Sequence, residues 1–172
     1  MTVKEKLEKL RGKMQAYGID AYIIPSTDPH LNEYVPSHFK ARAWISGFTG
    51  SAGTVVVTFD KAILWTDGRY YIQAEKQIAG TEFELYKMEK GIPNYIEFIE
   101  KSLSAGQVVG FDGRNFPCAD VLKMKETFEK KGIKIKSLVS KDSVIWFVDT
   151  AKLTKANMVS KPLRFMNLND TI

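Results

Sequence analysis

The second half of the chain alternates between two kinds of segment, and this alternation constrains the fold more than any other feature. Short apolar runs at residues 83–88, 107–113 and 133–139 predict strands. The stretches between them, 92–103 and 118–132, carry apolar residues at helical spacing. Strands that alternate with helices of this length are typical of an α/β fold, because a parallel strand pair needs a helical crossover.

The first half predicts an opening helix and a hairpin. Val3, Leu7, Leu10 and Met14 recur at helical spacing, and Gly18 is expected to end that helix. A buried strand is predicted at residues 20–25, and residues 53–66 contain two β-branched runs typical of a β-hairpin. A hairpin among helix-connected strands makes the sheet mixed. We therefore expect an α/β fold with a mixed sheet of about six strands and helices on both faces.

The composition fits one globular domain. The 172 residues are 44% hydrophobic and 26% charged, close to the averages for such domains. We find no apolar run near the ~18 residues of a membrane span and no signal-peptide pattern, so a cytoplasmic protein without a membrane partner is expected. Cys118 is the only cysteine, which excludes internal disulfides and cysteine-based zinc clusters.

The net charge of +5 raises nucleic acid as a possible partner. Most of the 25 cationic side chains are lysines that alternate with glutamates, as in KEKLEKLRGK. Proteins that read nucleic-acid sequence favour arginine placed with stacking aromatics. The pattern is therefore typical of a solvated surface, and no nucleic-acid partner is expected.

The glycine-rich segment SGFTGSAGT at residues 46–54 resembles a phosphate-binding loop only superficially. It leads into a strand rather than a helix and lacks the usual lysine. Ser51 lacks the glycine that a nucleophilic serine needs two residues earlier, since Thr49 stands there. We interpret the segment as a tight turn packed beside the sheet.

The segment DPHLNEYVPSH contains the only cluster of possible metal ligands or acid–base groups, namely Asp28, His30, Glu33 and His38. Two prolines interrupt the register that a zinc site would need, so no metal site is expected in this chain. Asp28 is predicted to cap the turn that follows it. His30 and Glu33 share one face, which points either into a cleft or to solvent.

The segment WTDGRYYIQAEKQ at residues 65–77 predicts a strand end, a turn and a helix. Asp67 is expected to stabilise the turn or cap the helix. Arg69 lies at the carboxyl end of a strand, where an arginine can bind a carboxylate through two hydrogen bonds. Two alternatives remain for Arg69, an internal ion pair or a carboxylate of a peptide or substrate.

Three segments in this order, DAYIIPSTDPHLNEY, ARAWISGFTGSAGTVVVT and AILWTDGRYYIQAEKQ, closely resemble the N-terminal domain of cytosolic-type Xaa-Pro aminopeptidases, in the creatinase/prolidase group. The resemblance covers about residues 1–147 and implies a ribonuclease-H-like α/β fold. Residues 148–172 show no clear period and are expected to form a linker or tail at the start of the connection to a catalytic domain.

In this family a C-terminal "pita-bread" domain cleaves the bond before proline, with two divalent metals, commonly manganese, held by Asp, His and Glu. The resemblance therefore implies that this chain is inactive alone and holds no cofactor. Its expected partners are the catalytic domain, a peptide with proline at the second position, and further copies in a homo-oligomer such as a homodimer. The alternative is a stand-alone binding or assembly module of the same fold.

In relatives the N-terminal domain contributes to subunit assembly and narrows access to the substrate cleft. By motif position, the candidates for that cleft are Asp28, His30, Glu33, Arg69 and Tyr70. No catalytic residue is expected among them.

Overall fold

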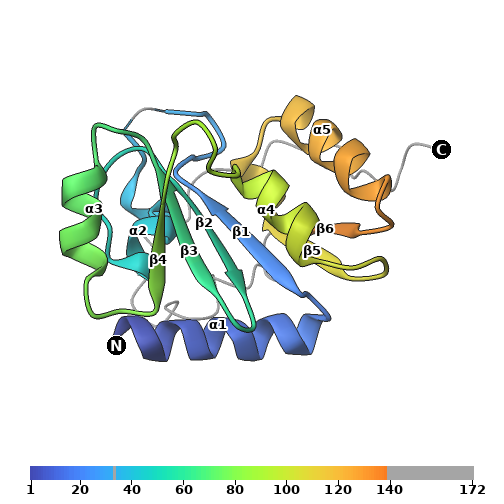
Figure 1. The fold of residues 1–172 in the computed structure, drawn as a ribbon, viewed down its shortest axis with the longest axis horizontal. Coiled ribbons are helices and arrows are strands. Elements are labelled where there is room, and N and C mark those ends of the chain that lie inside the picture. Colours follow the sequence, from blue (N-terminus) through green and yellow to red (C-terminus); the bar gives the residue numbers. More distant parts are fainter. Residues whose placement is uncertain (33, 139–172) are drawn as a thin grey trace.

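A computed structural model describes residues 1–32 and 34–138. Six strands form one sheet in the order β4-β3-β2-β1-β5-β6 (Figure 1). Strand β2 runs antiparallel to both of its neighbours, and the other neighbouring pairs are parallel. The prediction of a mixed six-stranded sheet is confirmed.

The strands are β1 (Ala21–Pro25), β2 (Thr54–Thr58), β3 (Ala62–Thr66), β4 (Phe83–Lys87), β5 (Val108–Asp112) and β6 (Lys134–Leu138). The helices are α1 (Val3–Tyr17), α2 (Ala41–Ser46), α3 (Tyr71–Ile78), α4 (Tyr95–Ser102) and α5 (Cys118–Glu129), with short 3-10 turns η1 (Ser37–Phe39) and η2 (Gly113–Asn115). Each predicted helix and strand that falls within the described residues is present.

Helix α1 shows why local sequence and structure agree. Thr2 and Glu5 form a capping box at its start, and Gly18 ends it in a left-handed conformation with φ of 64°. The predicted apolar stripe is buried, since Leu7, Leu10 and Met14 are at most 1% exposed. The helix therefore packs through that stripe on one face of the sheet.

The two faces of the sheet carry separate apolar clusters. Side chains of α1, α2 and α3 pack on one face, and side chains of α4 and α5 pack on the other. Strand β1 lies in the sheet between the two clusters, and its successive side chains point to opposite faces. Tyr22 and Ile24 therefore belong to the first cluster, and Ala21 and Ile23 to the second. Helices thus cover both faces, as predicted.

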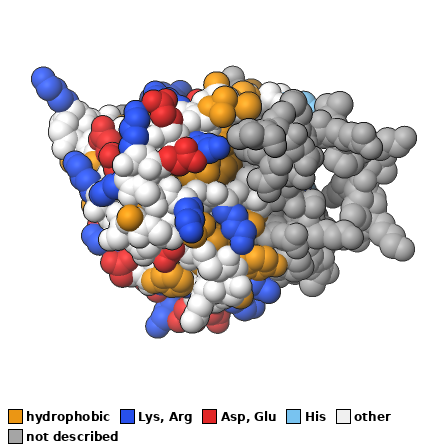
Figure 2. All heavy atoms as spheres, turned by 90° about the vertical axis from the view of Figure 1, so that its right-hand side faces the viewer, with side chains coloured by type: hydrophobic (Ala, Val, Ile, Leu, Met, Phe, Trp, Pro, Cys, Tyr) orange, Lys and Arg blue, Asp and Glu red, His pale blue; other side chains and the backbone are white. Residues whose placement is uncertain are grey.

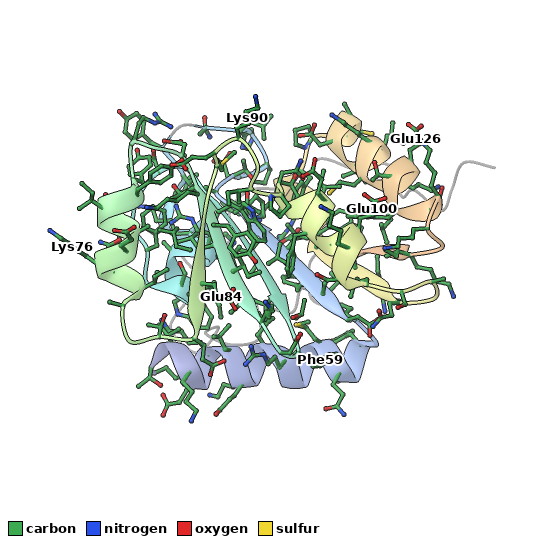
Figure 3. All side chains as sticks on the ribbon, in the orientation of Figure 1. Phe59, Lys76, Glu84, Lys90, Glu100 and Glu126 are labelled. Atoms are coloured by element: carbon green, nitrogen blue, oxygen red, sulfur yellow. The ribbon has the colours of Figure 1, made fainter. Side chains whose placement is uncertain are left out.

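One end of the sheet collects most of the connecting loops. Strands β1, β3, β4, β5 and β6 all run toward this end, and β2 begins there. We call it the carboxyl edge. It lies at the top of Figure 1 and includes the described residues 26–32, 34–36, 47–53, 67–70, 88–94 and 113–117. In Figure 3, Lys90 marks this edge and Phe59 marks the opposite one.

Charges of both signs are interspersed on the molecular face shown in Figure 2, with apolar side chains among them. Such mixing is typical of a solvated surface. Within residues 1–32 and 34–138, no helix is both long enough and apolar enough to cross a bilayer. The predicted boundary at residue 147 and the predicted tail at residues 148–172 lie outside the described residues.

Candidate functional site

Arg42 of α2 binds the backbone of the loop of residues 47–53 through hydrogen bonds. Its Nη1 donates to the Phe48 carbonyl at 2.6 Å, its Nη2 donates to the Gly50 carbonyl, and its Nε donates to Ser26 Oγ at 2.7 Å. The guanidinium also lies 4.7 Å from the centre of the Phe48 ring. Burial lowers the pKa of Arg42 to about 10, which still leaves it cationic at neutral pH.

The same loop is held from the side by α3. Gln77 accepts from the Thr49 N–H at 2.9 Å, and the amides of Gln73 and Gln77 both donate to the Thr49 hydroxyl. At the start of the helix, the Tyr70 hydroxyl lies 2.7 Å from that of Ser51. The exposed hydroxyls of the loop are therefore fixed in place by its neighbours.

Two glycines let this loop pack tightly. A Cβ on Gly50 would lie 2.3 Å from Phe48 Cζ, and a Cβ on Gly53 would lie 2.8 Å from the Trp65 carbonyl oxygen. Neither distance is compatible with a side chain unless something moves. The interpretation of this segment as a tight turn beside the sheet is confirmed.

Arg69 forms an internal ion pair at the carboxyl end of β3. Its backbone N–H and Nε donate to Asp67 Oδ1 at 3.0 and 2.9 Å, and its Nη2 donates to Oδ2 at 2.8 Å. These side-chain hydrogen bonds hold the pKa of Asp67 below its ordinary value. The Arg69 side chain is nevertheless 69% exposed and lies beside the Tyr70 ring. Asp67 therefore closes the turn and also orients an exposed cation.

A second Asp-Gly-Arg turn repeats this arrangement after β5. The Arg114 N–H and Nε donate to Asp112 Oδ1 at 3.1 and 3.0 Å, and Nη2 donates to Oδ2 at 2.6 Å. Burial alone would lower the pKa of Arg114, but hydrogen bonding and attraction to Asp112 outweigh burial, so the pKa is raised. The sequence analysis missed this pair, although the repeated tripeptide after a predicted strand was a visible signal.

Asp28 organises the loop after β1. The side chain is buried, its Oδ1 accepts from the N–H groups of His30 and Asn32, and its Oδ2 accepts from the Asn32 amide. Burial raises the pKa of Asp28, but these hydrogen bonds lower it by a larger amount. The pKa therefore lies below its ordinary value. The predicted capping of the turn is confirmed. His30 is exposed, and Glu33 lies outside the described residues.

The structure brings the other candidates together only in part. Arg69 and Tyr70 adjoin the braced loop, whereas Asp28 and His30 follow β1, which β2 separates from β3. Two strand spacings amount to roughly 10 Å. In the described part of the chain, no three His, Cys, Asp or Glu side chains are placed to hold a metal ion, so these residues do not fit a metal centre.

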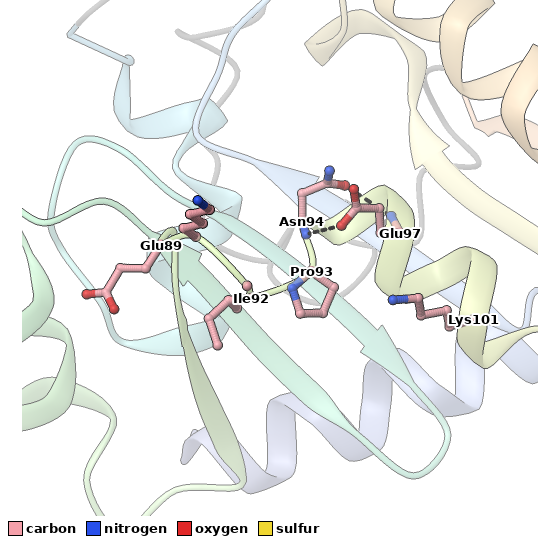
Figure 4. A pocket seen from close by; sticks show the side chains of 8 residues that line it. Glu89, Ile92, Pro93, Asn94, Glu97 and Lys101 are labelled. Atoms are coloured by element: carbon pink, nitrogen blue, oxygen red, sulfur yellow. Dashed lines mark hydrogen bonds between the residues drawn. The ribbon is translucent and has the colours of Figure 1, made fainter.

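An open depression of about 360 Å³ lies between β4 and α4 (Figure 4). Two of the polar residues that line it, Asn94 and Glu97, cap the start of α4. Asn94 accepts from the N–H groups of Ile96 and Glu97, and the Glu97 carboxylate accepts from the Asn94 N–H at 3.1 Å. These hydrogen bonds form a capping box that stabilises α4, which is a structural role.

Known proteins with similar sequences share this domain. A family model described as the creatinase/prolidase N-terminal domain matches residues 6–162. Aminopeptidase P2 of Arabidopsis thaliana is 46% identical over 133 residues, which cover 76% of this chain and 19% of that protein. Xaa-Pro aminopeptidase 2 of Homo sapiens is 51% identical over 106 residues, which cover 62% of this chain and 15% of that protein. The chain thus spans less than a fifth of either relative.

Two solved structures show the same fold. The X-prolyl aminopeptidase of Caenorhabditis elegans, described as a cytosolic enzyme with a di-nuclear active site, superposes with a TM-score of 0.82 at 30% identity. That match covers 90% of this chain and 26% of the enzyme. The N-terminal domain of a cytoplasmic peptidase from Mycobacterium tuberculosis has a TM-score of 0.60 at 23% identity and is covered over 98% of its length.

Proposed function

Since the chain belongs to the family of creatinase/prolidase N-terminal domains, we propose that it is the non-catalytic N-terminal domain of an Xaa-Pro aminopeptidase or dipeptidase. Such an enzyme hydrolyses the peptide bond before proline. The model of the creatinase/prolidase N-terminal domain matches residues 6–162, and the chain spans about a fifth or less of the curated relatives named above. Together these two observations carry the proposal.

The catalytic chemistry then belongs to a C-terminal pita-bread domain with two divalent metals, manganese by family resemblance. The C. elegans enzyme supports this assignment, since it is described as having a di-nuclear active site. We further propose a cytoplasmic location, a homo-oligomeric parent, and a domain of residues 1–147 followed by a linker at residues 148–172.

Within that enzyme, the carboxyl edge is proposed to shape access to the substrate cleft. Arg69 contributes an exposed cation whose orientation Asp67 fixes, and Tyr70 stands beside it on a braced turn. Asp28 positions His30 on the neighbouring loop. Glu33 is kept as a candidate on its motif position alone. A carboxylate of the peptide or of the catalytic domain is the group that Arg69 would attract.

The test is substitution of Arg69 in the full-length parent. Arg69→Ala should raise KM for an Xaa-Pro peptide about 3- to 10-fold, as expected for the loss of a partly exposed charged contact. Arg69→Lys should give a KM between those of the wild type and Arg69→Ala. The matched control is Arg11→Ala, because Arg11 also forms an ion pair, with Glu82 at 2.7 Å, but contacts the Thr58 carbonyl at the other end of the sheet. If Arg69→Ala unfolds the domain, or leaves KM at the level of the control, Arg69 has no role in the cleft.

A further inference from the structure

The chain contains two Asp-Gly sequences, Asp67-Gly68 and Asp112-Gly113, and each is followed by an arginine. Aspartate isomerises readily before glycine, because glycine has no side chain to block the approach of its nitrogen. The glycine nitrogen attacks the carboxyl carbon of the aspartate side chain and forms a C–N bond. The carboxyl hydroxyl leaves as water with the proton of that nitrogen, and a cyclic succinimide results.

Water then opens the succinimide ring. When water adds to the main-chain carbonyl carbon of the aspartate, the bond from that carbon to the glycine nitrogen breaks. The product is isoaspartate, in which the main chain runs through the former side chain and a free carboxylate remains on Cα. Water is the only other reactant, so under given conditions the folded structure decides which Asp-Gly sequence reacts faster.

Arg69 opposes this reaction at Asp67. Ring closure requires a neutral carboxyl group, since an ionised one has no hydroxyl to release, and it requires the side chain to turn toward Gly68. The N–H and guanidinium of Arg69 hold both carboxylate oxygens through hydrogen bonds of 2.8–3.0 Å. These bonds also keep the carboxyl ionised, because they hold the pKa of Asp67 below its ordinary value.

Asp112 accepts the same three hydrogen bonds from Arg114 but is held more firmly. It is the last residue of β5 and pairs with β6, whereas Asp67 lies just beyond the end of β3. The side chains of Asp112 and Arg114 are 11% and 20% exposed. Those of Asp67 and Arg69 are 33% and 69% exposed. An exposed pair on a turn opens at a lower free-energy cost than a shielded pair at a paired strand end.

The surroundings of Gly68 also leave room for the reaction. Gly68 is exposed, and a Cβ at this position would meet nothing closer than Cε2 of Tyr71 at 3.8 Å. Its φ is not positive. Water therefore reaches the bond that must break, and alanine fits in place of Gly68 without a clash.

We propose that isoaspartate forms faster at Asp67 than at Asp112, and that the Arg69 guanidinium restrains the reaction at Asp67. The product has one more carbon in its main chain and carries its free carboxylate on Cα. The hydrogen bonds that orient Arg69 depend on the present geometry of both groups, so isomerisation releases this exposed cation. The inference concerns the 172-residue chain alone and does not depend on the proposed function.

Timed incubation of the folded 172-residue chain at neutral pH tests the preference. Protein L-isoaspartyl methyltransferase labels the product, and peptide mapping by mass spectrometry assigns the label to a residue. Isoaspartate should appear at least about fivefold faster at Asp67 than at Asp112, because the exposed turn opens more readily. In denaturant the two rates should become similar. Equal rates in the folded chain, or a preference that persists in denaturant, would overturn the inference.

Substitution of Arg69 tests the restraint. Arg69→Ala should raise the rate at Asp67 about 2- to 5-fold, the factor that corresponds to an exposed ion pair, and should leave the rate at Asp112 unchanged. The matched control Arg11→Ala removes another ion-paired arginine, far from this turn, and should change neither rate. An unchanged rate at Asp67 in Arg69→Ala contradicts the role of Arg69. A rise at both aspartates would show general loosening of the fold and contradicts it as well.

Gly68→Ala tests the assignment of the reacting bond. The added methyl group hinders the approach of the nitrogen, and the position accommodates it. This variant should lose most of the product at Asp67 and keep the slow reaction at Asp112. Undiminished labelling of the peptide that contains Asp67 would place the reaction at another bond and overturn the inference.

Discussion

The hydroxyl of Tyr70 lies 2.7 Å from the hydroxyl of Ser51, and this contact joins the turn after β3 to the loop before β2. The Tyr70 ring also packs edge-on against Phe48, with the ring centres 5.9 Å apart. Arg69, the neighbour of Tyr70, is therefore carried on a turn that is tied to a braced loop. The contacts of Tyr70 therefore restrain the turn that carries the exposed guanidinium of Arg69.

The Tyr70–Ser51 contact can be measured with a double-mutant cycle. Tyr70→Phe and Ser51→Ala should each lower the free energy of unfolding by about 0.5–1 kcal/mol, because the contact is exposed to solvent. The double variant should lose less than the sum, with a coupling of about 0.5 kcal/mol. Urea denaturation provides the measurement, and strictly additive losses would show that the two hydroxyls do not interact.

Replacing Arg42 should be far more damaging than replacing Arg69. Arg42→Met removes the donors for the carbonyls of Phe48 and Gly50, so we expect a loss of about 3 kcal/mol in the free energy of unfolding. Arg69→Met should cost at most about 1 kcal/mol, because that ion pair is exposed. Similar losses in the two variants, measured by urea denaturation, would contradict the role assigned to Arg42.

Two glycine substitutions should shift stability in opposite directions. Gly53→Ala places a Cβ 2.8 Å from the Trp65 carbonyl oxygen and should destabilise the fold by about 1–3 kcal/mol. Gly12→Ala meets no atom within 4 Å in the middle of α1 and should stabilise it by about 0.5–1 kcal/mol. Thermal unfolding midpoints check both signs. A midpoint that rises in both variants would refute the tight packing of the loop.

Asp28 should make stability depend on pH in the acid range. Its pKa is lower in the folded chain than its ordinary value, because hydrogen bonds from Asn32 and His30 outweigh the opposing effect of burial. A carboxyl of this kind adds its full stability above the unfolded pKa near 3.9, and that stability is lost as the pH falls through the folded pKa.

Asp28→Asn should therefore be less stable than the wild type at pH 7, and the gap should narrow as the pH falls below about 4. The measurement is the free energy of unfolding of both proteins across this range. A gap that stays constant or widens in acid would show that the Asp28 carboxylate does not supply the effect.

Local patterns predicted most of the fold because each depends on neighbours along the chain. The stripe of Leu7, Leu10 and Met14 predicted α1, and Gly18 ended it as expected. The predicted helix from residue 92 begins only at Tyr95, because Asn94 supplies the cap and Pro93 remains outside. Boundaries of this kind are decided by hydrogen bonds of single side chains, which periodicity does not capture.

The site depends on contacts between distant segments, and sequence reasoning captured less of it. Arg42 lies in a short helix with no periodic signal, and only the folded chain brings it beneath Phe48 and Gly50. Arg69 had two open alternatives, and the geometry of the turn shows the ion pair with Asp67. That pair does not test a role in a substrate cleft, which stays a prediction.

The central claim is that this chain carries no peptidase chemistry of its own. The most direct test compares hydrolysis of an Xaa-Pro peptide in the presence of manganese by the 172-residue chain, freed of contaminating peptidases, and by the full-length parent. We predict that the parent cleaves the bond before proline and that the 172-residue chain shows no activity above the buffer. Cleavage by the purified 172-residue chain would contradict the assignment of catalysis to a C-terminal domain.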